Sequence, residues 1–74
     1  MLLPCPCCHY RTLSERGTLE ICPVCFWKDD GRDQTDAHGP NLVSLFEAQS
    51  NFTEFGASDL IWIGEVRPPL PSER

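Results

Sequence analysis

The chain has 74 residues, five of them cysteines, and a formal net charge of −5 at neutral pH. A chain of this length is one domain at most. The hydrophobic core of so short a chain contributes only about 3–5 kcal/mol to its stability, so an additional stabilising element such as a disulfide or a metal ion is expected. The acidic charge disfavours nucleic acid as a partner, because proteins bind polyanions through basic side chains that displace counterions. No segment approaches the ~20 consecutive apolar residues that a membrane-spanning helix needs.

Residues 4–28 are predicted to form a metal-binding β-hairpin. Residues 10–13 and 18–21 read as two short strands, and the second alternates polar and apolar side chains. The turn-forming residues between them would allow the two strands to pair. One hairpin would then carry two cysteine knuckles at its open ends, Cys5-Pro6-Cys7-Cys8 and Cys22-Pro23-Val24-Cys25.

The knuckles follow the pattern CxxC-x13-CxxC, which is typical of a metal site. We predict that four cysteines bind one ion: Cys5, Cys8, Cys22 and Cys25. A sulfur-only tetrahedral set favours zinc, so we expect one Zn²⁺ per chain, with iron as the alternative. Four protein ligands would close the coordination sphere, which favours a structural role over catalysis.

Two disulfides are the other use for four cysteines, and disulfides belong to oxidising compartments. The odd cysteine count fits a disulfide framework poorly, and the first residues lack the features of a signal peptide. We therefore expect a reduced, cytoplasmic protein. Cys7 and His9 are alternative ligands beside the four, but Cys7 would need a tighter loop and His9 would displace Cys8. Cys7 is expected to be a spare thiol.

Residues 29–43 are predicted to be an acidic loop with many turn formers and no apolar periodicity. Four aspartates suggest a second cation such as calcium, but they lack the spacing of an EF-hand: Asp29, Asp30, Asp33 and Asp36. Solvated charge is the expected role of this loop. His38 with Asp33 or Asp36 is the one pairing that an enzyme might need, and no nucleophile accompanies it, so we expect no enzymatic activity.

Residues 44–56 are predicted to form a helix that begins at Ser44, with Glu47 completing a capping box, and ends at Gly56. Residues 57–67 are too apolar to be free, and we expect them to pack against the helix as a strand or a short helix. This segment ends the single domain, residues 1–67. The proline-rich residues 68–74 are predicted to be an extended, flexible tail.

Several segments together resemble the bacterial cysteine-rich CPCC family, and the likeness runs from Cys5 to Pro69. They are Cys5-Pro6-Cys7-Cys8, residues 20–27, Gly39-Pro40-Asn41, Ser44-Leu45-x-Glu47-Ala48, Asn51-Phe52, Phe55-Gly56-Ala57 and Arg67-Pro68-Pro69. The resemblance implies metal binding and no particular activity. The knuckles alone also resemble those of zinc ribbons and rubredoxin, in which glycine usually follows the second cysteine; here His9 and Phe26 stand there.

The predicted fold is a small metal-stabilised α+β domain, a zinc-ribbon-like hairpin packed with one C-terminal helix. A closed metal site next to nine acidic residues after position 28 favours a non-enzymatic protein-interaction module with a basic protein as partner. The candidate contacts are Trp27, Asp29, Asp30 and Trp62. The alternative function is a rubredoxin-like electron carrier that holds iron in the same four cysteines.

Overall fold

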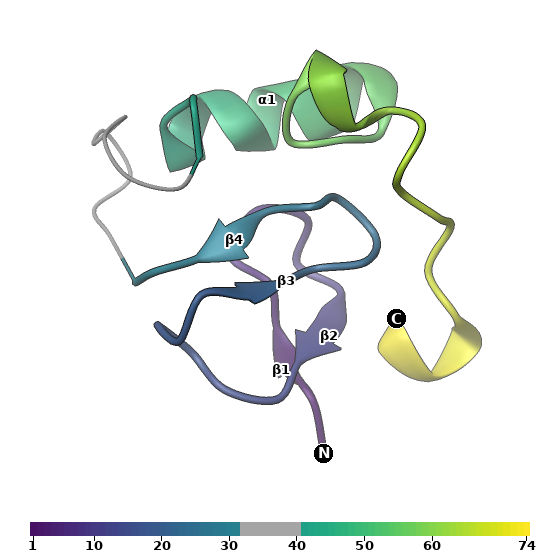
Figure 1. Ribbon diagram of the computed structural model, residues 1–74. Coiled ribbons are helices and arrows are strands. Elements are labelled where there is room, and N and C mark those ends of the chain that lie inside the picture. The colour runs from purple at the N-terminus through teal and green to yellow at the C-terminus, as the bar shows by residue number, and fades with distance from the viewer. Residues whose placement is uncertain (32–40) are drawn as a thin grey trace.

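Two short antiparallel hairpins and one α-helix make up the chain in a computed structural model that describes residues 1–31 and 41–74 (Figure 1). The elements are, in order, β1 (Leu3–Pro4), β2 (Arg11–Leu13), β3 (Glu20–Ile21), β4 (Lys28–Asp29), α1 (Leu45–Phe55) and the 3-10 helices η1 (Leu60–Trp62) and η2 (Pro71–Glu73). The hairpins form one layer, and α1 lies across them as a second. The predicted class, a small α+β domain with clustered cysteines, is confirmed.

The strands pair differently from the single hairpin that the sequence predicts. β1 pairs with β2, with Leu3 opposite Leu13, and β3 pairs with β4, with Glu20 opposite Asp29. Each hairpin therefore encloses one cysteine knuckle, and residues 14–19 connect the two hairpins instead of closing one. The reason is local, because each knuckle turns the chain back on itself within a few residues.

Both knuckles make the same turn. In the first, the N–H of Cys5 donates to the carbonyl of Tyr10 at 2.8 Å, and the N–H of His9 donates to the carbonyl of Cys5 at 2.8 Å. In the second, the corresponding donor–acceptor distances are 2.9 and 2.7 Å, for Cys22 to Trp27 and Phe26 to Cys22. The two backbone bonds bring the residues before and after each knuckle side by side, which places them to pair as strands.

His9 and Phe26 take the position where related knuckles have glycine, and both adopt the left-handed conformation, with φ of 69° and 68°. Glycine is the usual residue there because a Cβ atom is disfavoured at positive φ. The absence of glycine does not prevent either knuckle from adopting the left-handed turn. It adds backbone strain of order 1–3 kcal/mol per residue, which the surrounding structure must offset.

Asp29 fixes the connection between the hairpins. Its side chain is 1% exposed, and its Oδ2 accepts from Nε of Arg16 at 2.6 Å and from the N–H of Gly17 at 3.0 Å. Oδ1 accepts from the N–H of Gly31 at 3.3 Å. Burial raises the pKa of Asp29, but Arg16 and the two amide donors outweigh burial and hold that pKa below its usual range. The ionised carboxylate is thus a structural element of the linker.

α1 begins and ends at the residues that the sequence pattern selects. Oγ of Ser44 accepts from the N–H of Glu47 at 3.0 Å. Gly56, at φ 85°, donates its N–H to the carbonyl of Phe52 at 2.9 Å and ends the helix, since a side chain would be strained there. Ahead of the helix, the side chain of Asn41 donates to the carbonyl of Lys28 at 2.8 Å and accepts from its N–H at 3.0 Å.

The segment after α1 crosses the second knuckle and contains η1, so it is a short helix and not a strand. The N–H of Ser58 donates to the carbonyl of Cys25 at 2.8 Å, and the N–H of Arg67 donates to the carbonyl of Pro23 at 3.2 Å. Nδ2 of Asn51 donates to the carbonyl of Ser58 at 2.9 Å, which ties the segment to α1. The segment therefore packs on α1, as expected, and it also contacts the second knuckle.

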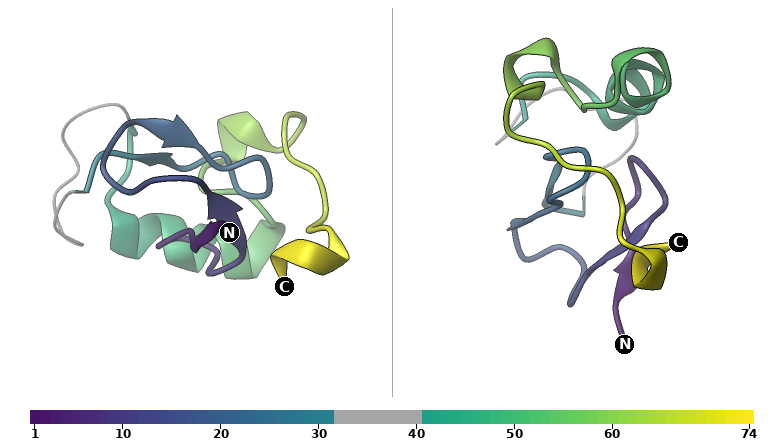
Figure 2. Two further views of the ribbon diagram at one scale, coloured as in Figure 1. Left: turned by 90° about the horizontal axis from the view of Figure 1, so that it is seen from below. Right: turned by 90° about the vertical axis from the view of Figure 1, so that its right-hand side faces the viewer.

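The C-terminal residues dock on the domain, and the prediction of a free, extended tail is wrong. η2 lies against β2, on the side of the molecule away from α1 (Figure 2). Glu73 is 5% exposed, forms a two-pronged ion pair with Arg67 at 2.8 and 2.9 Å, and accepts from the N–H of Leu70. Arg11 on β2 donates to the carbonyl of Arg74. The ion pair holds this segment on the domain, although its prolines favour an extended conformation.

The core lies between the hairpins and α1, and half of its buried members are cysteines. The other members are Leu13, Val24, Trp27, Leu45 and Ala48. Leu45 and Ala48 are the residues that α1 buries fully, so the helix adds little to the core by itself. Among the described residues, no helix is both long and apolar enough to cross a membrane.

We predict that Ser44→Ala lowers the free energy of unfolding by about 1 kcal/mol, because the N–H of Glu47 loses its acceptor at the start of α1. Urea unfolding at a fixed free-metal concentration measures the change. Ser50→Ala is the matched control, since Ser50 is an exposed residue within α1. An equal effect of both substitutions would show that the cap contributes nothing specific.

Candidate metal centre

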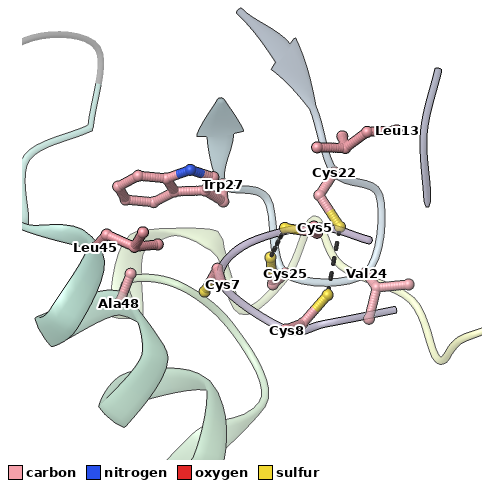
Figure 3. Close-up of a cluster of buried hydrophobic side chains, with 10 residues drawn as sticks. All are labelled: Cys5, Cys7, Cys8, Leu13, Cys22, Val24, Cys25, Trp27, Leu45 and Ala48. Carbon is pink, nitrogen blue, oxygen red and sulfur yellow. Dashed lines mark hydrogen bonds between the residues drawn. The ribbon is translucent and has the colours of Figure 1, made fainter. Parts of the chain in front are cut away.

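Four cysteine sulfurs converge between the two knuckles (Figure 3). Within the described part of the chain, the Sγ atoms of Cys5, Cys8, Cys22 and Cys25 all lie within 4.8 Å of one another. The Sγ atoms of Cys5 and Cys25 are 3.6 Å apart, and those of Cys8 and Cys22 are 3.7 Å apart. Each of these pairs takes one sulfur from each knuckle, so the sulfur cluster joins the two hairpins.

The distances fit a tetrahedral metal centre and not a disulfide. A disulfide bond is about 2.05 Å long, and all five cysteines are free thiols. In a tetrahedral site with zinc–sulfur bonds of about 2.3 Å, neighbouring sulfurs are about 3.8 Å apart. The 3.6 and 3.7 Å separations are close to that value. The four side chains are therefore already arranged for a tetrahedral, sulfur-preferring cation.

The protonation states of the four cysteines depend on one another, and their arrangement favours a bound cation. Hydrogen bonds from Cys25, Cys5 and Cys8, and a further one from Thr12, lower the pKa of Cys22 against the opposing effect of burial. The bond with Cys22 is the largest cause that raises the pKa of each of the other three thiols, and burial raises them further. One thiolate is thus stabilised at the expense of three thiols. All four can ionise together only when a bound cation offsets their repulsion.

Neighbouring residues orient the ligand set, and sequence reasoning missed the most direct of them. Oγ1 of Thr12, 6% exposed on β2, donates to Sγ of Cys22 at 3.0 Å. Nothing in the cysteine spacing marks Thr12, because its partner belongs to the other knuckle. The Nε2 of Gln49 on α1 donates to the carbonyl of Pro6 at 2.8 Å and holds the first knuckle against the helix. Such outer contacts keep metal ligands in place.

The structure brings together the four predicted cysteines and leaves out both alternatives. Cys7 is 2% exposed and lies to one side of the four sulfurs in Figure 3, where its thiol helps to raise the pKa of Cys25. The side chain of His9 is exposed. Cys7 therefore belongs to the core next to the centre, as expected for a spare thiol.

Two of the predicted partner contacts are buried, which corrects that part of the prediction. Trp27 is 1% exposed and belongs to the core around the sulfurs, because the second knuckle turns this residue inward. Asp29 is also 1% exposed, and its carboxylate is engaged by the linker between the hairpins. Neither side chain is available at the surface.

The other two predicted contacts are partly exposed. Asp30 is half-buried, and Trp62 stacks on the ring of Phe26 with 4.6 Å between ring centroids. Nζ of Lys28 lies 4.4 Å from the centroid of the Trp62 ring, within the range of a cation–π interaction. The remaining candidates of the acidic loop lie outside the described residues: Asp33, Asp36 and His38.

A family model described as cysteine-rich CPCC matches residues 3–73, a span that includes both knuckles, α1 and η2. The chain belongs to the cysteine-rich CPCC family. A comparison with curated proteins gives no match. For this CPCC chain, family membership and the sulfur cluster together support a metal-binding structural module, and they leave the metal open.

We predict that Cys22→Ser abolishes metal binding and unfolds the CPCC domain, because the loss of one ligand cripples a structural site. Cys7→Ser should retain one metal ion per chain and the fold, because Cys7 is outside the ligand set. Circular dichroism and metal analysis of both variants measure the two effects. Equal damage from both substitutions would contradict the four-cysteine assignment.

We predict that Thr12→Val lowers metal affinity by about 10–100-fold, because the isosteric side chain removes the hydrogen bond to Sγ of Cys22. Competition with a chelator of known affinity measures the change. Thr53→Val is the control, since Thr53 is exposed on α1, where its hydroxyl donates to the carbonyl of Gln49. Unchanged affinity in Thr12→Val would show that the hydroxyl does not tune the centre.

Proposed function

We propose that the chain is a structural zinc-binding module with one Zn²⁺ held by Cys5, Cys8, Cys22 and Cys25. The observation that carries this proposal is the buried four-sulfur set, in which exposure ranges from 0% to 8%. Such a set favours zinc, and structural zinc binding contributes about 10–16 kcal/mol in small peptides, enough to decide whether a small domain folds. The metal's role here is to hold the two hairpins together.

We further propose that the module is not an enzyme and acts by binding another protein, with the cytoplasm as its setting. Four protein ligands leave no coordination position for a substrate or a reactive water. The charge supports a basic partner, because nine acidic residues follow position 28 against three basic ones. With Trp27 and Asp29 buried, Trp62 and Asp30 are the remaining members of the proposed contact set.

Native mass spectrometry with elemental analysis, on protein purified under reducing conditions, tests the metal. We expect one zinc per chain, and we expect chelation to remove both the metal and the fold. Cys22→Ser is the control that should contain no zinc. Iron in place of zinc would replace this proposal with an electron carrier of the rubredoxin type, since iron also accepts four sulfurs.

Affinity purification of the zinc-loaded chain from its natural cell, at low and high salt, tests the partner. We expect a basic protein that is released as salt rises, because salt screens exposed charges. Recovery of an acidic partner whose binding ignores salt would contradict the charge argument.

A further inference from the structure

Three large aliphatic side chains project into solvent from one short turn. Leu60 is 65% exposed, Ile61 57% and Ile63 47%, and all three belong to η1 and its C-terminal cap. We call these three residues the η1 patch. Scattered apolar residues are normal at a protein surface, whereas contiguous exposed apolar patches mark interaction sites.

The η1 patch is held rigidly. Oδ1 of Asp59 accepts from the N–H of Ile61 at 3.4 Å, and the N–H of Trp62 donates to the carbonyl of Asp59 at 3.0 Å. Trp62 turns inward between the exposed residues and stacks on Phe26, which directly follows the second knuckle. The patch is thus anchored beside the second knuckle, and a partner need not supply the free energy to order it.

Charge around the patch favours a basic occupant. Asp59 and Glu65 flank the patch on either side in the chain, and the N–H of Glu65 bonds to the carbonyl of Trp62 at 2.9 Å. The ion pairs seen among the described residues engage Asp29 and Glu73 and do not include these two flanking carboxylates. The nearby cation, Lys28, already lies over the ring of Trp62.

The size of the patch favours a short segment over a second copy of the chain. A stable association of two folded proteins buries about 800 Å² and about 20–30 residues on each side. Three side chains on one turn fall far short of that. They match instead the few apolar anchors by which a peptide segment docks.

We propose that the η1 patch binds a short protein segment that combines apolar anchors with lysine or arginine. The proposal rests on the interaction function given above and names its surface and the chemistry of its partner. The apolar anchors would cover Leu60, Ile61 and Ile63, and the basic residues would lie beside Asp59 and Glu65.

Selection from a phage-displayed library of random dodecapeptides against the zinc-loaded chain tests this surface. We expect the enriched peptides to be apolar and basic. Their affinities, measured by fluorescence anisotropy, should fall about tenfold or more in Leu60→Ser/Ile61→Ser and less steeply in Glu65→Lys. Phe46→Ser is the matched control, because Phe46 is 66% exposed on α1, and it should bind as the wild type does.

Peptide-induced NMR shifts in the wild-type chain locate the site independently of any variant. Shifts confined to residues 59–65 support the proposal. Shifts centred on Phe55 and Val66 would move the site to the apolar groove of about 350 Å³ that these residues line, and would overturn the proposal. So would enrichment of acidic peptides, failure to enrich any, or peptide-independent dimerisation lost in Leu60→Ser/Ile61→Ser.

Binding of the natural partner to the wild type and to the variant distinguishes an error in this surface from an error in the proposed function. A partner that binds equally to the wild type and to Leu60→Ser/Ile61→Ser would leave the interaction function intact and place it on another surface. Zinc-loaded chain that recovers no partner and enriches no peptide would overturn both.

Discussion

The rest of the structure depends on four sulfur atoms that are buried within 4.8 Å of one another. Four thiolates at that separation repel strongly, and burial removes the water that would screen them. A bound cation would resolve the conflict and would link two hairpins whose strands are only two or three residues long. Isolated two-stranded hairpins are marginal in water, so folding and metal binding are expected to be one event.

Sequence reasoning succeeded where the controlling interactions are local. The CxxC spacing identified the four cysteines that the structure brings together. Ser44 and Gly56 marked the two ends of α1. Within each knuckle and at each end of α1, the residues that form the pattern lie within a few positions of one another. A single sequence contains enough information for such features.

It failed where no pattern in the sequence marks the deciding contacts. Two strands of two or three residues carry too little side-chain pattern to choose a partner, so the knuckle turns decided the pairing. The ion pair of Arg67 with Glu73 spans a proline-rich stretch that suggests a free tail. Burial of Asp29 depends on donors more than ten residues away in the linker, and a lone aspartate in an acidic stretch gives no sign of it.

The buried core and the proposed binding surface lie in different parts of this small protein. Cysteines make up half of the buried core, and α1 contributes little more than Leu45 and Ala48 to it. The exposed aliphatic residues of η1 take no part in the core, yet Ser58 and the Trp62–Phe26 stack connect their turn to the second knuckle. Loss of an ion bound by the four cysteines would therefore remove the support of the surface at which binding is proposed.

The side chain of Asn41 also bears on the behaviour of the chain at high concentration. Its amide occupies both the N–H and the carbonyl of Lys28, the groups through which an additional strand would extend the sheet beyond β4. Unpaired strand edges are where sheet proteins join edge to edge and aggregate. A single amide, on a residue that is itself 5% exposed, thus covers the outward-facing backbone groups of Lys28 at one edge of this sheet.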